Sequence, residues 1–598
     1  MYLRKSWSTT AITSACLVFS CTKGLEYSPL SIASSQSSQP EIAAGVTIDD
    51  LRNQNVVSSV KYTTTDFGGG NWVYDTLDKK SLDNTGTVLV TKFGQRLKRS
   101  MATQVVNALW FGLKTDGSDQ TDVLQAAIYA SSGNTLQMPA GTYFTKQLSI
   151  ISNIVIIGNN TKLRMIQGSY DNSMIKLTGI TNVRISAMEI ALNGISGNMW
   201  DGTSAIQLQN CSNVQIDNCF IHDNTYVGIR LIGGNNNVRI NNNTIENTDT
   251  GVHANNTNTN INIIKNIIDK GTSEGITVYG YSPQNIPSNF LIDSNIILYK
   301  QGSFGINIPY AKFGTITHNT IQYCLGGITL HDAVSVGSDD YYTSDMVIKN
   351  NAINNTGFGI IYVGNRTVVS NNIINAVQQD GINANNFNNT AILTSGVTIS
   401  NNTITNPALA GGGRGGISVK NMVSSTVSNN VIRNCANSFA VRFNGNCSDL
   451  TINNNNCTDG MLQTTNTSFP LNITGTGNVF SNSYFPVSYP LTCKFNLALN
   501  STKYTCDTTY NTAPDGLGVY DVNTFCVRTK YFIANGTIEN VTPSWVGRTI
   551  ILASSNYVVI KQGSYIKLKN NTDAIIPANN YIALHYDGTS WNEINRTF

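Results

Sequence analysis

The sequence has little charge and little proline for a chain of 598 residues, with only 13 Pro. Charged residues make up 12% of it, roughly half of the share in an average globular protein. The 38 basic and 35 acidic residues nearly cancel at +3, so no strong field favours nucleic acid or a membrane surface. The apolar share of 40% is enough to bury a core, which argues against disorder. Low charge with abundant Asn, Gly, Thr and Ile predicts an all-β protein rather than a helical bundle, a coiled coil or a Rossmann-type enzyme.

Motifs for metal and nucleophile chemistry are also missing. No CxxC pair or spaced His cluster indicates zinc, and no P-loop, GxSxG or HExxH sequence occurs. Two of the 11 Cys lie near the N-terminus, and the other nine are an odd number, which excludes a complete disulfide framework within the chain. Six of the nine fall inside repeats and are expected as buried thiols. The better candidates for one disulfide are Cys493, Cys506 and Cys526.

Residues 1–21 have the pattern of an export signal. Arg4 and Lys5 precede an apolar run that is too short to span a bilayer. The run ends in Leu17-Val-Phe-Ser-Cys21, which resembles a bacterial lipobox with Cys21 as the lipidated residue, and conventional cleavage is the alternative. Residues 22–59 follow as a linker. We therefore expect an exported lipoprotein of the bacterial outer membrane or cell surface, or otherwise a secreted protein, that meets a membrane only through its lipid anchor.

Self-similarity dominates the middle of the chain. Segments such as Asn213-Val-Gln-Ile-Asp-Asn218 recur, and between them stand Gly-Ile pairs such as Gly228-Ile229. Each period holds short alternating segments punctuated by Gly or Asn, which is strand spacing and not helix spacing. The equivalent Asn recurs at intervals of 21 to 32 residues, at positions 218, 242, 266, 295, 319, 351, 372, 402, 430 and 455.

One such period cannot bury its apolar side alone, so successive coils must stack. Parallel strands in stacked coils lie about 4.8 Å apart, and an Asn at each corner can bond to the next Asn and to the turn backbone. The usual crossover rule makes the coil right-handed. The predicted fold class is therefore all-β: a right-handed parallel β-helix solenoid over residues 108–484, with a small N-terminal β segment over 60–107 and a C-terminal β-sandwich-like domain over 485–598.

The entrance to the repeats carries a family resemblance. Phe111-Gly-Leu-Lys-Thr-Asp-Gly-Ser-Asp-Gln-Thr-Asp-Val-Leu-Gln-Ala-Ala127 is followed by Leu136-Gln-Met-Pro-Ala-Gly-Thr-Tyr143. These segments resemble the opening of the pectate-lyase superfamily of β-helix proteins, which includes polygalacturonase-like enzymes and phage tailspikes. The resemblance implies the fold, a polysaccharide as partner and no nucleic acid, and likeness to tailspikes allows a homotrimer. Activity stays open, because this scaffold hosts lyases, hydrolases, epimerases and binding proteins.

Both ends of the solenoid need a cover. Asp116 to Ala127 is predicted as an N-capped amphipathic helix that plugs the first end, with Asp119 and Asp122 as caps and not catalysts. At the other end, the segment from residue 485 loses the Asn repeat and alternates as strands do. A cap, an oligomerisation module or a glycan-binding module would fit that tail.

The hydrolase signature of the resembled superfamily is incomplete. Polygalacturonase-like hydrolases carry NTD, a DD pair, GHG and RIK in order on successive coils. Asn247-Thr-Asp249 matches the first, but no DD pair follows one coil later, and neither GHG nor RIK occurs. The DPH signature of alginate epimerases is absent too. We interpret Asn247-Thr-Asp249 as a chance match in an Asn-rich repeat.

Strand alternation places candidate site residues in outward-facing columns. Ile229 points inward and Arg230 outward, and His253 stacks on Arg230 in the next coil. Residues 222 to 279 gather an unusual number of His, acidic and basic side chains. The predicted catalytic group is Arg230, His253, Glu246, Asp269 and Tyr279. The residues predicted to bind substrate are His222, Asp223, Glu274, Asn307, Lys420 and Arg442.

Two kinds of polysaccharide cleavage fit this group. In a lyase, Arg230 would neutralise a uronate carboxylate, and His253 or Tyr279 would remove the neighbouring proton. Repulsion by Arg230 should lower the pKa of His253, which would keep the imidazole neutral and able to act as a base. In a glycosidase, Glu246 and Asp269 on neighbouring coils would lie near the retaining separation of about 5 Å. No cofactor is required, although the same two carboxylates could hold a Ca²⁺ that binds a uronate. The rival reading is a non-catalytic, glycan-binding or adhesive surface protein.

Two further patches are alternatives for the site. Long insertions on solenoids commonly form the sides of a groove. His318 lies at a repeat corner and is expected to be structural. One patch, beside a Gly-rich loop, comprises Asp380, Asn383, Arg414, Lys420 and Arg442. The other, on the longest insertion, comprises His331, Asp332, Asp339, Asp340, Tyr341 and Tyr342.

Overall fold

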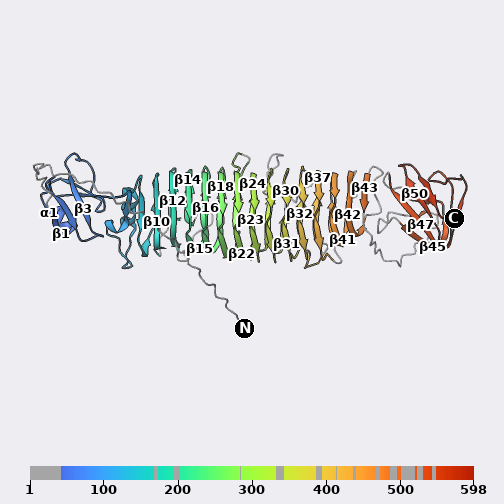
Figure 1. Cartoon of the computed structure of the whole chain (residues 1–598), viewed down its shortest axis with the longest axis horizontal. Helices are drawn as coiled ribbons and strands as arrows, with labels where there is room; N and C mark the ends of the chain where they lie inside the picture. The colour runs from blue at the N-terminus through green and yellow to red at the C-terminus, as the bar shows by residue number, and fades with distance from the viewer. Residues whose placement is uncertain are drawn as a thin grey trace, which may run out of the picture.

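The protein is a long rod in the computed structural model, with stacked strands along its middle and a smaller sheet at each end (Figure 1). The expected signal, Cys21 and the candidate disulfide cysteines lie outside the described residues. The structure describes residues 42–166, 173–192, 203–282, 284–331, 343–361, 363–385, 393–411, 414–435, 439–464, 472–484, 494–499, 519–520, 530–541 and 547–598.

A five-stranded sheet forms the N-terminal end, in the order β1-β2-β3-β5-β4. Its core is built on Trp72, Leu89 and Leu97, and the short helix α1 (Ile48–Asn53) adds two further buried residues. The sheet and α1 begin within the segment expected as linker, so this unit starts earlier than residue 60. Its strands are β1 (Ile42–Val46), β2 (Lys61–Thr64), β3 (Gly70–Asp75), β4 (Val88–Val90) and β5 (Arg96–Arg99).

Helix α2 (Thr121–Ala130) covers the first end of the solenoid. It packs Leu124 and Ile128 into the solenoid core. The helix begins later than the predicted Asp116, and Gln120 at its N-cap position makes no capping bond with its side chain. The Asp119 carboxylate accepts the Thr121 backbone N–H at 2.9 Å, as expected of a residue that caps the helix start. Asp116 is wrong as a helix start because its carboxylate accepts the Ser118 backbone N–H, which holds the chain in a turn.

The solenoid is a single 38-stranded arrangement in which each coil contributes to three faces. The first face contains β7 (Thr135–Met138), the first halves of β10 (Ile154–Met165) and β12 (Thr181–Ala191), β14 (Ser212–Asp217), β16 (Asn236–Asn241), β18 (Thr259–Ile264), β21 (Ser288–Asp293), β24 (Lys312–Thr317), β27 (Val347–Lys349), β30 (Val368–Ser370), β34 (Thr398–Ser400), β37 (Met422–Ser428), β40 (Ser448–Asn453) and β42 (Asn472–Tyr484). The second contains β8 (Gly141–Thr145), the second halves of β10 and β12, the first halves of β15 (Phe220–Ile232) and β17 (Thr244–Asn255), β19 (Ile267–Gly271), β22 (Ile296–Lys300), β25 (Thr320–Gln322), β28 (Ala352–Asn354), β31 (Ile373–Asn375), β35 (Thr403–Thr405), β38 (Val431–Arg433) and the first part of β41 (Asn456–Thr464), whose second part belongs to the third face. The third contains β9 (Leu148–Ser149), β11 (Ser173–Thr178), β13 (Ser204–Gln209), the second halves of β15 and β17, β20 (Ile276–Tyr279), β23 (Phe304–Pro309), β26 (Gly326–His331), β29 (Phe358–Ile361), β32 (Ile382–Asn385), β36 (Gly415–Lys420) and β39 (Phe439–Asn444).

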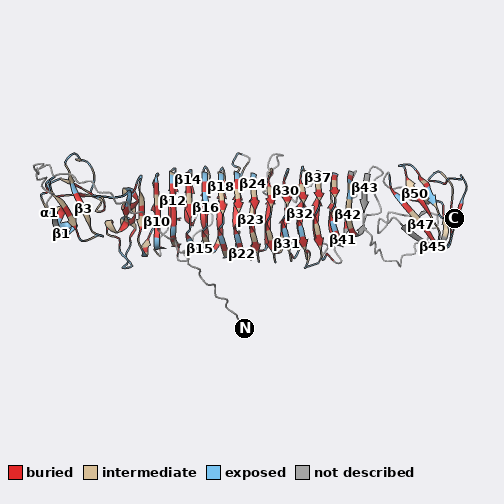
Figure 2. Ribbon diagram, in the orientation of Figure 1, coloured by how far each residue is buried: buried red, intermediate tan, exposed pale blue. Residues whose placement is uncertain are grey.

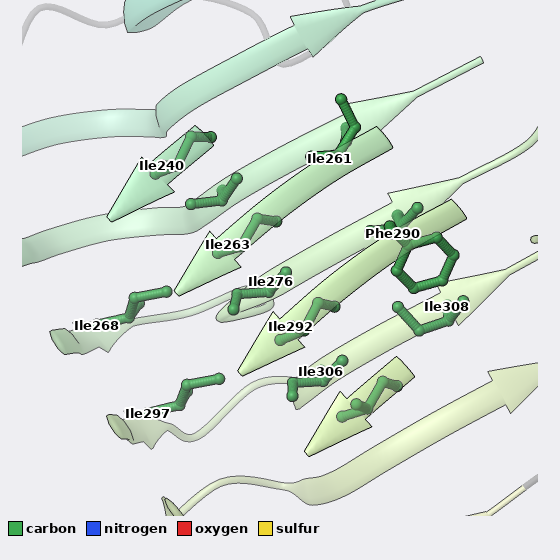
Figure 3. Packing of buried hydrophobic residues seen from close by; sticks show 14 of the residues in the cluster. Ile240, Ile261, Ile263, Ile268, Ile276, Phe290, Ile292, Ile297, Ile306 and Ile308 are labelled. Carbon is green, nitrogen blue, oxygen red and sulfur yellow. The ribbon is translucent and has the colours of Figure 1, made fainter. Parts of the chain in front are cut away.

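Isoleucine fills the interior of these coils. Ile240, Ile263 and Ile292 stack in register on the first face, and Ile276 and Ile306 do so on the third (Figure 3). Each of these side chains is buried, and burial runs along the whole stack (Figure 2). Like residues stack on like because parallel strands repeat about every 4.8 Å in the same register.

An asparagine ladder holds the corner between the first and second faces. Asn266 donates its Nδ2–H to Asn295 Oδ1 at 3.0 Å, and the same oxygen accepts the Asn266 backbone N–H at 2.9 Å. Eight of the ten predicted positions are confirmed, but 218 and 242 stand one residue early. Asn218 and Asn242 take the left-handed turn conformation, with φ of 55° each. The ladder runs through Asn243, Asn266, Asn295, Asn319, Asn351, Asn372, Asn402, Asn430, Asn455 and Asn478.

The C-terminal end is a six-stranded sheet that surrounds its own core, which includes Leu552 and Trp591. Strand β43 (Lys494–Leu499) still pairs with β42, so the stacked strands continue past residue 484. The tail sheet follows the order β45-β47-β50-β51-β48, with β49 beside β47. Its strands are β45 (Lys530–Ile538), β47 (Thr549–Ile560), β48 (Ile566–Lys567), β49 (Ala574–Pro577), β50 (Tyr581–Tyr586) and β51 (Trp591–Arg596).

Candidate functional site

The third face differs from the other two because many of its outward side chains are buried. Arg230 is 7% exposed and Thr329 0%, although both point away from the isoleucine core. On the first face, in contrast, Arg239 is exposed, and on the second, Glu246 is half-buried. The longest connections between strands also join the third face, for example from His331 to Val347.

Several polar side chains of this face have an oxygen atom without a hydrogen-bond partner. Among the described residues, five of their oxygen atoms are buried and have no hydrogen-bond partner. Such atoms are rare in native proteins, because each one costs free energy unless something pairs with it. They are Asn255 Oδ1, Thr277 Oγ1, Asn307 Oδ1, Thr329 Oγ1 and Asn383 Oδ1.

His253 lies at the centre of the predicted catalytic group. Strand pairing places it between Arg230 and Thr277, as the sequence register predicts. Burial and, second, the Arg230 charge lower the pKa of His253 to about 4, while Glu274 opposes them. The expected direction is confirmed, but burial contributes more than the expected repulsion. The imidazole is therefore neutral at neutral pH.

Glu274, Asn307 and Tyr279 surround the same column. Asn307 donates its Nδ2–H to Glu274 Oε1 at 3.3 Å. Tyr279 packs edge to face on Tyr281 with ring centroids 4.5 Å apart, and burial raises the pKa of Tyr279. Tyr281, which is not among the predicted site residues, interacts with the Arg230 charge.

Glu246 and Asp269 belong to the second face and not to the His253 column. They stack in register on β17 and β19, as predicted. Lys270 lies between them, with its Nζ 2.5 Å from Glu246 Oε1 and 3.7 Å from Asp269 Oδ2. A turn at Asn247 separates Glu246 from the third face. The predicted group of five is therefore two groups, and its carboxylates carry an ion pair that the sequence did not reveal.

His222 and Asp223 lie in an ion network on the second face. His222 contacts Asp223 through Nδ1 at 2.8 Å and Glu189 through Nε2 at 3.2 Å. Glu189 also pairs with Arg164, and its neighbours lower its pKa to about 2, although burial alone would raise it. Both ring nitrogens of His222 are thus used within the protein.

The patch around Asp380 is also brought together by the fold. Asp380 is fully buried and accepts the Gly415 backbone N–H and the Asn383 Nδ2–H, each at 2.8 Å. Arg414 approaches its Oδ2 at 3.5 Å. In the patch around His331, residues 332–342 lie outside the described residues, so that alternative is not placed.

Lys300 is a buried lysine with a shifted pKa that is not among the predicted site residues. Its Nζ donates to the carbonyl oxygens of Thr248, Asp249 and Lys270 at 2.7, 3.1 and 2.8 Å. Burial lowers its pKa to about 8. The sequence could have indicated it only by its position, since Lys300 is a charged residue at the end of β22, where the chain turns toward the third face.

Within the described ranges, no group of three or more His, Cys, Asp or Glu side chains is arranged to hold a metal ion. The expectation of Ca²⁺ therefore rests on Glu246 and Asp269 alone. No helix in the described part of the chain is long and apolar enough to cross a membrane.

Comparison with known proteins adds two family matches. Residues 112–292 and 262–411 match the model of the right-handed β-helix region. Residues 46–102, which hold β2 to β5, match the phage tail protein small four-stranded β-sheet domain.

Solved structures similar to this chain come from phage and bacteria. The enzymatically active domain of bacteriophage CBA120 tailspike protein 2 is 14% identical, with 90% of this chain and 69% of that one covered and a TM-score of 0.41. The A-module of an Azotobacter vinelandii mannuronan C-5 epimerase is 16% identical over 64% and 99%, with a TM-score of 0.43. A surface adhesin of Streptococcus pneumoniae is 17% identical over 57% and 93%, also with a TM-score of 0.43.

Proposed function

The chain belongs to the right-handed β-helix family, and from that premise we propose that its third face binds an acidic polysaccharide, which Arg230 and His253 cleave as a lyase. The row of buried oxygens without partners carries the proposal. Sugar hydroxyls are the donors that would satisfy these acceptors, once the side chains that cover them rotate aside. A glycan along the axis would meet a new coil about every 4.8 Å.

The lyase step uses a base and a group that neutralises charge. Arg230 pairs with the uronate carboxylate, whose negative charge grows as the neighbouring carbon loses its proton. The neutral His253 imidazole takes that proton, a carbon–carbon double bond forms, and the glycosidic carbon–oxygen bond breaks. Tyr279 keeps its proton at neutral pH, as a tyrosine ordinarily does, and burial raises its pKa further, so it can protonate the leaving oxygen. Glu274 and Asn307, joined to each other, orient the sugar.

Two alternatives have weaker support. A glycosidase would use Glu246 and Asp269, but the Lys270 ammonium forms an ion pair with Glu246 and also lies 3.7 Å from Asp269 Oδ2. A binding-only or adhesive protein is favoured by one observation, the low exposure of Arg230. Either alternative keeps the glycan as ligand and changes only the chemistry.

Location and assembly are part of the same proposal. We infer that the protein is exported and anchored at the bacterial surface by lipid on Cys21, and that it assembles as a homotrimer. Cys21→Ala should release the protein from membrane fractions, and light scattering should give three times the chain mass. If Cys21→Ala stays in the membrane fraction, the idea that lipid on Cys21 anchors the protein is wrong.

The reaction is tested by ultraviolet absorbance on a panel of uronate polymers. A lyase produces unsaturated, absorbing ends, whereas a glycosidase produces only new reducing ends. Arg230→Gln and His253→Gln should each lower kcat by about a hundredfold. Arg239→Gln, an arginine change on the first face, should keep full activity. Absence of both products on every polymer would leave the binding-only alternative.

A further inference from the structure

A stripe of uncharged side chains runs along the outside of the second face. Its members occupy the same outward position on nine successive coils, and each is in register with the next. Ile267, Ile296 and Ile373 are 42%, 40% and 57% exposed. Contiguous exposed apolar side chains mark interaction sites, whereas single ones are common on any surface. The second-face stripe consists of Phe220, Thr244, Ile267, Ile296, Thr320, Ala352, Ile373, Thr403 and Val431.

Two tyrosines lie beside the stripe, at the corner between the second and third faces. The rings of Tyr299 and Tyr323 stack with their centroids 4.9 Å apart, and the side chains are 42% and 43% exposed. Both residues have the left-handed backbone conformation, with φ of 53° and 57°, which costs free energy in a bulky residue. Other coils have at this corner a residue that favours the conformation, namely Asn247, Asn355 and Asn406. Exposed rings in a strained position therefore indicate a contact outside the chain.

Charged side chains lie beside the stripe and not within it. Lys270 and Glu246 form an ion pair with each other on the second face. On the first face, in contrast, the outward position holds Arg184 and, two coils further, Arg239. The cores of protein interfaces are depleted of charge and enriched in aromatic residues, as the stripe and the tyrosine pair are. Two stripes in contact would bring no like charges together.

The length and the repeat of the stripe fit a second copy of the chain. Its eight coil steps, at about 4.8 Å each, make it about 38 Å long, and the solenoid that carries it is straight (Figure 1). Five residues of strand and corner, at about 3.3 Å each, give a width of about 17 Å. The area is then roughly 650 Å² on each copy, close to the roughly 800 Å² per partner of a stable interface. A partner must repeat at the same spacing to keep contact over this length, and another solenoid of this sequence does so.

We propose that copies of this chain associate side by side and in parallel through the second-face stripe. Parallel packing places each coil at the height of the same coil in the next copy, so Ile296 meets its own equivalent. Three copies arranged in this way line a common axis with their stripes. The third faces point away from the contact and stay open to a glycan. The number of three copies rests on the proposed function, whereas the contact surface does not.

Sedimentation of the full chain over a range of concentrations tests the surface. Ile296→Asp and Ile373→Asp should each raise the dissociation constant of the assembly by about a hundredfold, because each buries an unpaired charge in the contact. Leu291→Asp is the matched control, since Leu291 is a half-buried outward residue on the first face of the same coil as Ile296. The proposal is wrong if wild type sediments as a single chain, or if the stripe variants and Leu291→Asp assemble with equal strength.

A milder variant guards against loss of folding. Tyr323→Asn installs the residue that other coils have at this corner, so it should melt no lower than wild type. Loss of an aromatic contact should nevertheless weaken the assembly by about tenfold. An unchanged dissociation constant in a folded Tyr323→Asn would remove the tyrosine corner from the interface.

Disulfide cross-linking tests the parallel orientation. Under mild oxidation Ile296→Cys should give a linked pair of chains on a non-reducing gel, because equivalent residues meet across the contact. Wild type and Leu291→Cys should not give this band. A band of equal strength in all three proteins, or none in Ile296→Cys, would contradict parallel packing through the stripe.

Polymer assays separate this inference from the proposed function. If wild type cleaves no uronate polymer but Ile296→Asp still dissociates, the lyase proposal fails and the interface remains. If Ile296→Asp keeps its assembly while Arg230→Gln abolishes cleavage, the interface fails alone. If Ile296→Asp keeps its assembly but loses binding to polygalacturonate, the stripe is a glycan surface and the inference is wrong.

Discussion

At the scale of single residues, burial decides more of the site's chemistry than charge does. Arg230 stacks on His253 and repels its charged form, yet removal from water is the larger cause of the low pKa of His253. Desolvation disfavours the charged form of any imidazole, whichever cation stands beside it. The base in the proposed reaction is therefore made by the covered third face as a whole.

The low pKa of His253 predicts a specific loss of stability in acid. The unfolded chain takes up this proton near pH 6.5 and the folded chain only near pH 4. Between these values the unfolded state holds more protons, so the free energy of unfolding falls as the pH falls. Wild type should therefore lose more of its Tm than His253→Gln between pH 6.5 and pH 4. Parallel Tm curves for the two proteins would contradict the low pKa.

At the scale of elements, the Asn ladder at the corner between the first and second faces fixes how neighbouring coils stack. Each ladder Asn uses its Oδ1 and Nδ2 fully, between neighbouring coils, without any charge. Replacement by an apolar side chain removes these bonds and leaves buried backbone groups of two coils unpaired.

Asn351→Leu should lower the free energy of unfolding by roughly 1–3 kcal/mol, because partners of the ladder remain buried without bonds. Asn354→Ser is the matched control, since Asn354 points outward on the second face in the same coil. Urea denaturation measures both. Equal stability of the two variants would show that the ladder adds nothing to folding.

Lys300 should stabilise another corner, the turn between the second and third faces. Lys300→Met removes the donor from three buried carbonyls and should lower the free energy of unfolding at pH 7 by roughly 1–3 kcal/mol. The folded pKa of about 8 lies below the value of 10.5 for a free lysine. Between these two pH values the unfolded chain binds more protons, so wild type should gain stability relative to Lys300→Met as the pH rises. A gap between the two proteins that is constant from pH 7 to pH 10 would contradict this assignment.

The elements also mark how far sequence alone could lead. The column from Arg230 through His253 to Thr277 follows from strand period and repeat length, and the strand pairing matches it. The predicted ladder position was one residue early at 218 and 242 because Asn also favours the left-handed conformation at the neighbouring corner position. At 242 the ladder residue is the adjacent Asn243, and at 218 the next position is Cys219, whose backbone N–H donates to Asn243 Oδ1. Lys270 between Glu246 and Asp269 could not be predicted, since a side chain at a turn can lean toward either face.

At the scale of the whole molecule, a cation between two indole rings joins the N-terminal sheet to the solenoid. Arg99 on β5 lies 4.4 Å from the Trp72 ring of its own sheet and 4.7 Å from the Trp110 ring at the solenoid entrance. Its Nε donates to the Gly86 carbonyl at 2.5 Å, and burial lowers its pKa to about 10. Gly112 adds to this junction, because its φ of 90° and the nearby Phe67 ring leave no space for a side chain.

Arg99→Met should therefore uncouple the sheet from the solenoid. The substitution keeps a long apolar side chain but loses the charge over both rings and the bond to Gly86. Arg96→Met is the control, because Arg96 lies on the same strand and bonds only to Ser81 and Gly94 among the described residues. Calorimetry should show a separate, lower transition for the sheet in Arg99→Met, and proteases should cut the exposed residues 100–105 faster. If Arg99→Met and Arg96→Met show the same unfolding transition and the same rate of proteolysis, the sheet and the solenoid are held together by other contacts.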